Sequence, residues 1–174
     1  MAYKETWYGR YYEDFEVGDV YRGPLGRTIT EADNVWMTLL TMNTNQSHFN
    51  DHYAETTPFG KPIVNSGVTL AIVLGMSVID TSQKAFANLG WDRIKLTYPV
   101  MVGDTLYVES QVLDKRESKS RPYGGIVKVR TRGLNQEGKT ILVYERSIFI
   151  YKRTATQDKG FWPEPDVPIE ELGV

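Results

Sequence analysis

The sequence contains no cysteine, which excludes disulfide scaffolds, cysteine-ligated zinc, iron–sulfur clusters and thiol nucleophiles. It also lacks a long hydrophobic run. The longest nearly uninterrupted apolar stretch covers residues 68–79, well short of the ~18 residues that suggest a membrane span. The first residues carry no apolar stretch of the kind that a secretory signal requires. These absences predict a cytoplasmic protein without a membrane partner.

Neither sign of charge is in excess, because 20 lysines and arginines face 22 aspartates and glutamates. That balance argues against nucleic acid as the main partner. Of the 174 residues, 41% are hydrophobic and 24% are charged. A chain of this size and composition can bury one ordinary hydrophobic core.

Two helices are predicted in the first half of the chain. Thr30 followed by Asp33 forms a capping pattern, and the apolar residues after it recur at helical spacing, so we predict a helix over residues 31–42. Residues 67–80 are apolar at almost every position. This is typical of a helix buried on all sides, and the alternative of one continuous strand would be unusually long.

The second half alternates apolar and polar residues, which indicates β-strands. Residues 135–138 form a tight turn between two of these strands and so predict an antiparallel hairpin. The expected extended segments are residues 20–29, 93–100, 105–112, 127–132 and 141–149. A twisted sheet with one apolar face can wrap a wholly apolar helix.

The predicted fold class is therefore α+β, a single hot-dog domain in which an antiparallel β-sheet wraps a long buried central helix. This domain covers residues 1–153, with its core at about residues 10–153. Residues 154–174 are rich in proline and glutamate and form a C-terminal tail. We expect this tail, which includes Phe161 and Trp162, either to dock on a partner or to fray.

The polar segment over residues 43–66 is the strongest candidate for a site. It holds the only two histidines, His48 and His52, and long irregular segments inside a domain are usually functional. A short helix capped by Asn50 fits residues 51–56. The spacing of the two histidines also suits a pair of metal ligands. However, the segment is not His-Glu-x-x-His and no third histidine exists, so we expect neither a metal nor a cofactor.

Residues 43–54 and 59–66 resemble the signature of MaoC-like (R)-specific enoyl-CoA hydratases. Asn45, His48 and Ala54 fall in register with that signature, and residues 59–62 match it with Lys61 in place of arginine. Residues 99–106 are also similar to a strand entry of the family. The resemblance covers about residues 10–153 and implies a hot-dog hydratase that acts on a coenzyme A thioester.

The chain departs from the family pattern at Asn43, where the family has its catalytic aspartate, and at Ser66, where it has the glycine that opens the central helix. Gly67 follows one position later. With these departures the chain is similar to a subgroup of the family that acts on branched C5-dicarboxylyl thioesters such as mesaconyl- or itaconyl-CoA.

The resemblance implies a role for each site residue. His48 takes a proton from water and returns it to the α-carbon, since a histidine ordinarily titrates near pH ~6.5. Asn43 holds the water, and the backbone N–H groups of Ser66 and Gly67 face the thioester oxygen. The remaining candidates support the site or bind the phosphates of coenzyme A: Asp51, His52, Asn45 and Asp33 in support, and Lys119 and Arg121 at the phosphates.

Two other functions stay open from the sequence, a hot-dog acyl-CoA thioesterase and a non-catalytic dimer that binds acyl thioesters. In either case we expect a homodimer or an assembly of dimers, because a single sheet leaves an edge to be covered. Trp36 and Phe49 are candidates to close an apolar pocket. Arg27 and Arg93 are alternative partners for a second carboxylate on the substrate.

Overall fold

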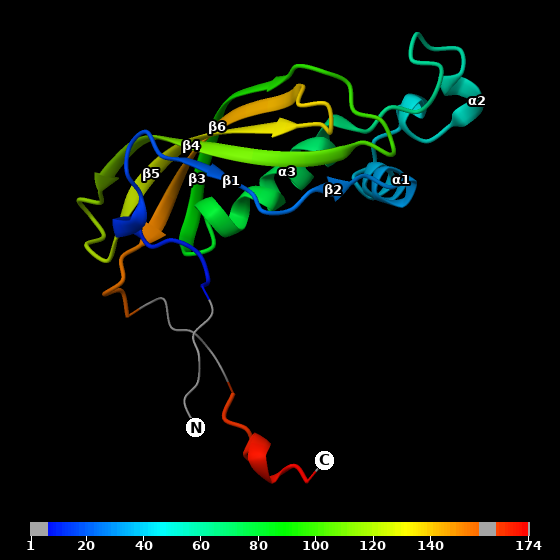
Figure 1. Ribbon diagram of the computed structural model, residues 1–174. Coiled ribbons are helices and arrows are strands. Elements are labelled where there is room, and N and C mark those ends of the chain that lie inside the picture. Colours follow the sequence, from blue (N-terminus) through cyan, green and yellow to red (C-terminus); the bar gives the residue numbers. More distant parts are fainter. Residues whose placement is uncertain (1–6, 157–162, 174) are drawn as a thin grey trace.

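One antiparallel sheet of six strands curves around a central helix (Figure 1). The computed structural model describes residues 7–156 and 163–173. The strand order is β1-β4-β5-β6-β3, and β2 pairs with β4 off this path. The strands are β1 (Val20–Arg22), β2 (Arg27–Thr28), β3 (Ala85–Leu96), β4 (Thr105–Glu117), β5 (Gly124–Leu134) and β6 (Thr140–Tyr151).

Within the described residues, three α-helices accompany the sheet, and three short 3-10 helices lie outside it. The α-helices are α1 (Glu31–Leu40), α2 (Asp51–Ala54) and α3 (Ser66–Thr81). The 3-10 helices are η1 (Tyr12–Asp14), η2 (Gln46–His48) and η3 (Ile169–Glu171). The predicted capping pattern is confirmed, because the Asp33 amide donates to Thr30 Oγ1 and the Thr30 amide donates to the Asp33 carboxylate.

The core lies between α3 and the inner face of the sheet. Val68 and Val73 of α3 are buried against Leu106 and Val108 of β4 and Tyr144 of β6. This arrangement confirms the predicted α+β hot-dog architecture.

The composition of the central helix predicts burial on all sides, and this prediction is wrong. From Thr69 onward its buried residues recur every four positions, and together they define one flank, consisting of Val68, Thr69, Val73, Ser77 and Thr81. Gly75 and Ile79 are exposed. The sheet of one chain covers only one flank of a helix, so the other flank remains apolar and uncovered.

The predicted strand over residues 93–100 is wrong at both ends, because β3 begins at Ala85 and ends at Leu96. Three register shifts against β6 interrupt it, and these irregularities remove the simple alternation by which a strand is recognised. The extended segment over residues 20–29 is split into β1 and β2. The hairpin turn is confirmed, since the Asn135 amide donates to the Lys139 carbonyl.

Helix α1 also differs from its pattern. The apolar spacing that predicts it does not mark its buried face: Asn34 and Thr38 are the buried residues of the helix, whereas Trp36 is 79% exposed. Leu39 and Leu40 are exposed as well.

Residues 163–173 are exposed and lie apart from the sheet (Figure 1). Phe161 and Trp162, which the sequence had offered as a docking segment, lie outside the described residues. Among the described helices, none is both long enough and apolar enough to cross a bilayer.

A buried carboxylate anchors the outer face of the sheet. Glu145 of β6 lies 2.8 Å from Arg130, 3.0 Å from Lys128 and 3.2 Å from Arg93. Hydrogen bonds from Arg130 and Lys128 lower the pKa of the Glu145 carboxyl from 4.5 to about 2. The folded protein therefore favours the ionised form more strongly than the unfolded chain does.

We predict that Glu145 makes stability depend on pH in the acid range. Because its pKa is lower in the folded state, its contribution is present above pH 4.5 and is lost as the pH falls towards 2. Glu145→Gln should therefore be less stable than the parent at neutral pH, and the difference should shrink across this window. Urea unfolding at several pH values measures this. Glu117→Gln, at an exposed ion pair with Lys152, is the control and should show no comparable window.

Candidate active site

His48 is held in a fixed orientation by a single backbone carbonyl. The residue ends η2, is 9% exposed, and places its Nδ1 3.0 Å from the Ile63 carbonyl oxygen. A carbonyl oxygen can only accept a hydrogen bond, so in the neutral ring the proton lies on Nδ1. The Nε2 atom then keeps its lone pair. This is the tautomer that a general base requires.

The polar residues before His48 shape the loop that carries it. Asn45 caps η2 by accepting from the Ser47 amide at 3.1 Å, and Asn43 Oδ1 accepts from the Asn45 amide at 3.0 Å. The Ile63 amide donates to the Ser47 carbonyl at 3.1 Å. The two amide side chains thus stabilise the loop from within, and the segment that contains Ile63 fixes it from outside.

His48 lines a cavity of about 190 Å³. Asp51, from the first turn of α2, and Lys61 lie in the same wall, together with Glu31, Asn34, Val35, Pro62 and Val102. Neither Asn43, Asn45 nor the exposed His52 belongs to this lining. Of the predicted supporting residues, Asp51 is therefore the one that shares the cavity with His48.

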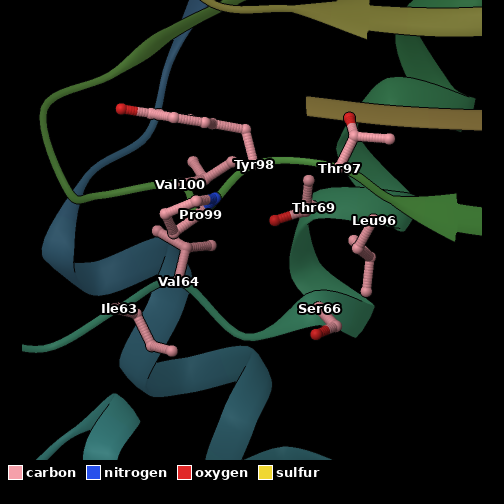
Figure 2. Close-up of a pocket in the computed structure, with 9 residues that line it drawn as sticks. All are labelled: Ile63, Val64, Ser66, Thr69, Leu96, Thr97, Tyr98, Pro99 and Val100. Atoms are coloured by element: carbon pink, nitrogen blue, oxygen red, sulfur yellow. The ribbon is translucent and has the colours of Figure 1, made fainter. Parts of the chain in front are cut away.

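A second cavity of about 240 Å³ lies at the start of α3. Figure 2 shows the segment from Leu96 to Val100 on one side, with Ser66 and Thr69 of α3 and the residues Ile63 and Val64 on the other. The short segment over residues 61–66 contributes to both cavities. The histidine and the start of α3 are thus connected through the same few residues.

The first turn of α3 leaves one of the two predicted amides available. Asn65 caps the helix, and its Oδ1 accepts from the Gly67 amide at 2.8 Å. The Ser66 amide has no hydrogen-bond partner within the described chain. It therefore remains the candidate donor to an anionic oxygen.

Two buried asparagines at the site were not found from the sequence. Asn65 stands directly before the apolar run, where a helix cap is expected, so its role could have been recognised. Asn34 carries no such signal, because it lies inside a predicted helix and differs in no way from a solvated polar residue.

Several other candidates are engaged away from His48. Asp33 caps α1, and hydrogen bonds from Thr30 hold the pKa of its carboxyl below the usual range. Arg27 pairs with Asp33 at 2.6 Å, and Arg93 pairs with Glu145. The cavity of His48 is lined by neither Trp36 nor Phe49.

Lys119 and Arg121 lie in the loop after β4, whereas the cavity of His48 includes Val102, just before β4 begins. Thirteen residues of strand separate the two ends, which amounts to roughly 40 Å at ~3.3 Å per residue. The Arg121 guanidinium stands 5.0 Å from the centre of the Phe86 ring. Within one chain, the structure does not bring these two cations to His48.

The described residues include no group of three or more histidine, aspartate or glutamate side chains placed to hold a metal ion. The expectation of a site without metal or cofactor stays a prediction.

The chain resembles known proteins over nearly its whole length. A family model described as mesaconyl-CoA hydratase matches residues 3–167. A mesaconyl-CoA hydratase of Cereibacter sphaeroides is 32% identical over 160 residues, which cover 92% of this chain and 46% of that protein. The chain thus spans about half the length of the curated relatives it matches.

Solved structures agree with the fold. A putative MaoC domain dehydratase from Chloroflexus aurantiacus superimposes with a TM-score of 0.82 at 30% identity, over 95% of this chain and 47% of that one. A Mycobacterium tuberculosis protein described as having a double hot-dog fold gives a TM-score of 0.76 at 19% identity, over 90% of this chain and 47% of that one. The second likeness concerns the fold alone.

We predict that Asn65→Ala destabilises the protein. The change removes the cap of α3 and leaves Thr38 without the donor that lies 3.2 Å away, so the free energy of unfolding should fall by about 1–2 kcal/mol. Asn65→Asp retains the capping oxygen and should lose less. Thermal unfolding of the three proteins measures this, and equal stability of all three would contradict the assigned cap.

Proposed function

The chain belongs to the mesaconyl-CoA hydratase family, and we propose that it reversibly adds water to the double bond of a 2-enoyl-CoA thioester. The proposed substrate is a branched C5-dicarboxylyl thioester such as mesaconyl-CoA. Because the chain covers about half of its curated relatives, its own activity and substrate are proposals. The observation that carries them is the buried imidazole whose Nδ1 is bound to Ile63 and whose Nε2 is left as a base.

Hydration requires His48 to take one proton from water and then to give one proton to the α-carbon. Nε2 of His48 takes a proton from water, the water oxygen bonds to the β-carbon, and the electron pair of the double bond moves into the thioester as an enolate. The imidazolium then returns its proton to the α-carbon, which leaves a 3-hydroxyacyl thioester and neutral His48. One histidine can carry both steps because the two protons move in sequence.

The enolate oxygen needs a hydrogen-bond donor, and the Ser66 amide at the start of α3 supplies one. Asn43 cannot titrate, so its proposed role is to orient the water through the loop that it stabilises. Asp51, in the wall of the same cavity, is the carboxylate that we assign to the support of His48. No step in this scheme requires a metal or a redox cofactor.

Two other functions use the same cavity. A thioesterase would direct water at the carbonyl carbon and release free thiol, and a binding protein would retain the thioester unchanged. The family match supports hydration over both. Mass spectrometry of a panel of straight and branched enoyl-CoAs distinguishes a gain of one water from a loss of thiol.

We predict that His48→Ala abolishes the loss of the conjugated-thioester absorbance, since the variant has no imidazole in the cavity to take the proton from water and return it. Asn43→Asp should retain activity, because a carboxylate oxygen can accept from the Asn45 amide as Asn43 Oδ1 does and so preserves the loop. Initial rates with mesaconyl-CoA, compared at equal concentrations of folded protein, measure both. A His48→Ala protein with full activity would refute the mechanism.

We also propose that the protein works as a homodimer formed through β3. This strand ends the sheet order, and its far edge has no partner among the described residues. Exposed apolar side chains line it, namely Phe86, Leu89, Trp91, Ile94 and Leu96. Ile79 of α3 is exposed as well, and a protein of similar fold and about twice the length is described as having a double hot-dog fold. A second copy of this chain would supply the second hot-dog domain and cover the free edge of β3.

A dimer of this kind would change which residues meet. In an antiparallel pairing about a two-fold axis, the start of β3 in one copy lies beside the end of β3 in the other. The loop with Lys119 and Arg121 is near the start of β3, since Arg121 contacts Phe86. The cavity at Ser66 is at its end. The phosphates of coenzyme A would then be bound by the second copy.

We predict that Trp91→Arg converts the dimer to a monomer, because a charge would be buried at the centre of the pairing strand. Sedimentation velocity measures the change directly. Leu25→Arg, at an exposed site between β1 and β2, should leave the dimer intact. A parent protein that sediments as a monomer would contradict the proposed assembly.

A further inference from the structure

Helix α1 buries polar side chains at the face that meets the site. Asn34 is 1% exposed and Thr38 is fully buried, although the helix has apolar residues that could have taken these positions. An amide without hydrogen bonds is costly to bury. The hydrogen bonds of Asn34 therefore indicate why this residue is placed inward.

Asn34 binds the segment that carries His48 and the segment that orients its ring. Its Nδ2 donates to the His48 carbonyl at 2.8 Å and to the Ile63 carbonyl at 3.2 Å. Its Oδ1 accepts from the Asn65 amide at 2.9 Å. The Ile63 carbonyl is also the acceptor for His48 Nδ1. One side chain thus fixes the backbone of His48, the acceptor of its ring and the residue that caps α3.

We propose that Asn34 is a positioning residue for the reaction, which fixes the orientation and the tautomer of His48 and its place relative to the start of α3. This inference rests on the proposed function, because it assigns Asn34 to the same site. The polar atoms of the Asn34 side chain are bound to backbone groups rather than directed at the substrate. It acts by holding the Ile63 carbonyl where only an Nδ1 proton of His48 can reach it.

The bonding pattern calls for an asparagine at this position. Aspartate would keep the acceptor for Asn65 but would place an oxygen against two carbonyl oxygens. Leucine would leave all three backbone groups without their partner. Alanine would remove the contacts and open space beside the loop, so that the His48 ring could turn.

Asn34→Ala tests the proposal, with Thr38→Val as the matched control. Thr38 lies one turn further along the same buried face, and its hydroxyl accepts from Asn65 but makes no bond to His48 or Ile63. Both variants remove buried hydrogen bonds from α1. Only Asn34→Ala removes those that reach the histidine.

The expected result is a fall in kcat on the order of 10- to 100-fold for Asn34→Ala, with a much smaller change in KM, because the base is displaced while the other seven residues of the cavity wall are kept. Thr38→Val should keep most of its kcat even where its melting temperature drops. Nitrogen-15 NMR gives a second readout: in the parent, the neutral His48 ring should carry its proton on Nδ1. In Asn34→Ala it should become a mixture of tautomers, and the exposed His52 serves as the reference.

The proposal is overturned if the His48 ring keeps its Nδ1 tautomer in Asn34→Ala, or if kcat falls equally in both variants. Should Asn34→Ala fail to fold, Asn34→Asp replaces it with the same two readouts, since it preserves the volume and removes the donor. A parent protein without hydratase activity would instead refute the proposed function. The ring measurement would then decide the role of Asn34 by itself.

Discussion

The carbonyl oxygen of Ile63 is the acceptor on which the site depends. It receives hydrogen bonds from His48 Nδ1 and Asn34 Nδ2, so both of its lone pairs are occupied. Because a carbonyl cannot donate, this contact alone determines which nitrogen of the histidine is free to act as a base. A shift of the Ile63 carbonyl would therefore change which nitrogen of His48 carries the proton, even though His48 itself is unchanged.

The sheet and the central helix explain why that carbonyl is in the right place. The Val64 amide donates to the Val100 carbonyl at 2.8 Å, and Ile63 forms an isolated bridge with Met101. The segment between the loop of His48 and α3 is thus attached to the turn that precedes β4. A long strand and a buried helix are rigid supports, and a loop held between them can keep a polar site in a fixed geometry.

One copy of the chain leaves apolar side chains exposed at two places, on β3 and on α3. In a single chain, β3 carries several exposed apolar side chains and α3 exposes Ile79, and the relatives are about twice as long. The proposed dimer accounts for both observations. The dimer also gives a role to Lys119 and Arg121, which lie at the opposite end of β4 from His48 in the same chain and would bind the coenzyme A phosphates at the partner's site.

Local patterns in the sequence determined the fold class, the central helix predicted over residues 67–80, the hairpin at residues 135–138 and His48 as the residue of interest. These features follow from spacing, capping and turn chemistry, which act over a few neighbouring residues. The family resemblance added the reaction class. Tertiary structure alone decided that α1 turns Asn34 inward and Trp36 outward, and that β3 is shifted in register against β6. Each of these depends on contacts between residues far apart in the chain, where the energy of one buried hydrogen bond can outweigh the preference of a local pattern.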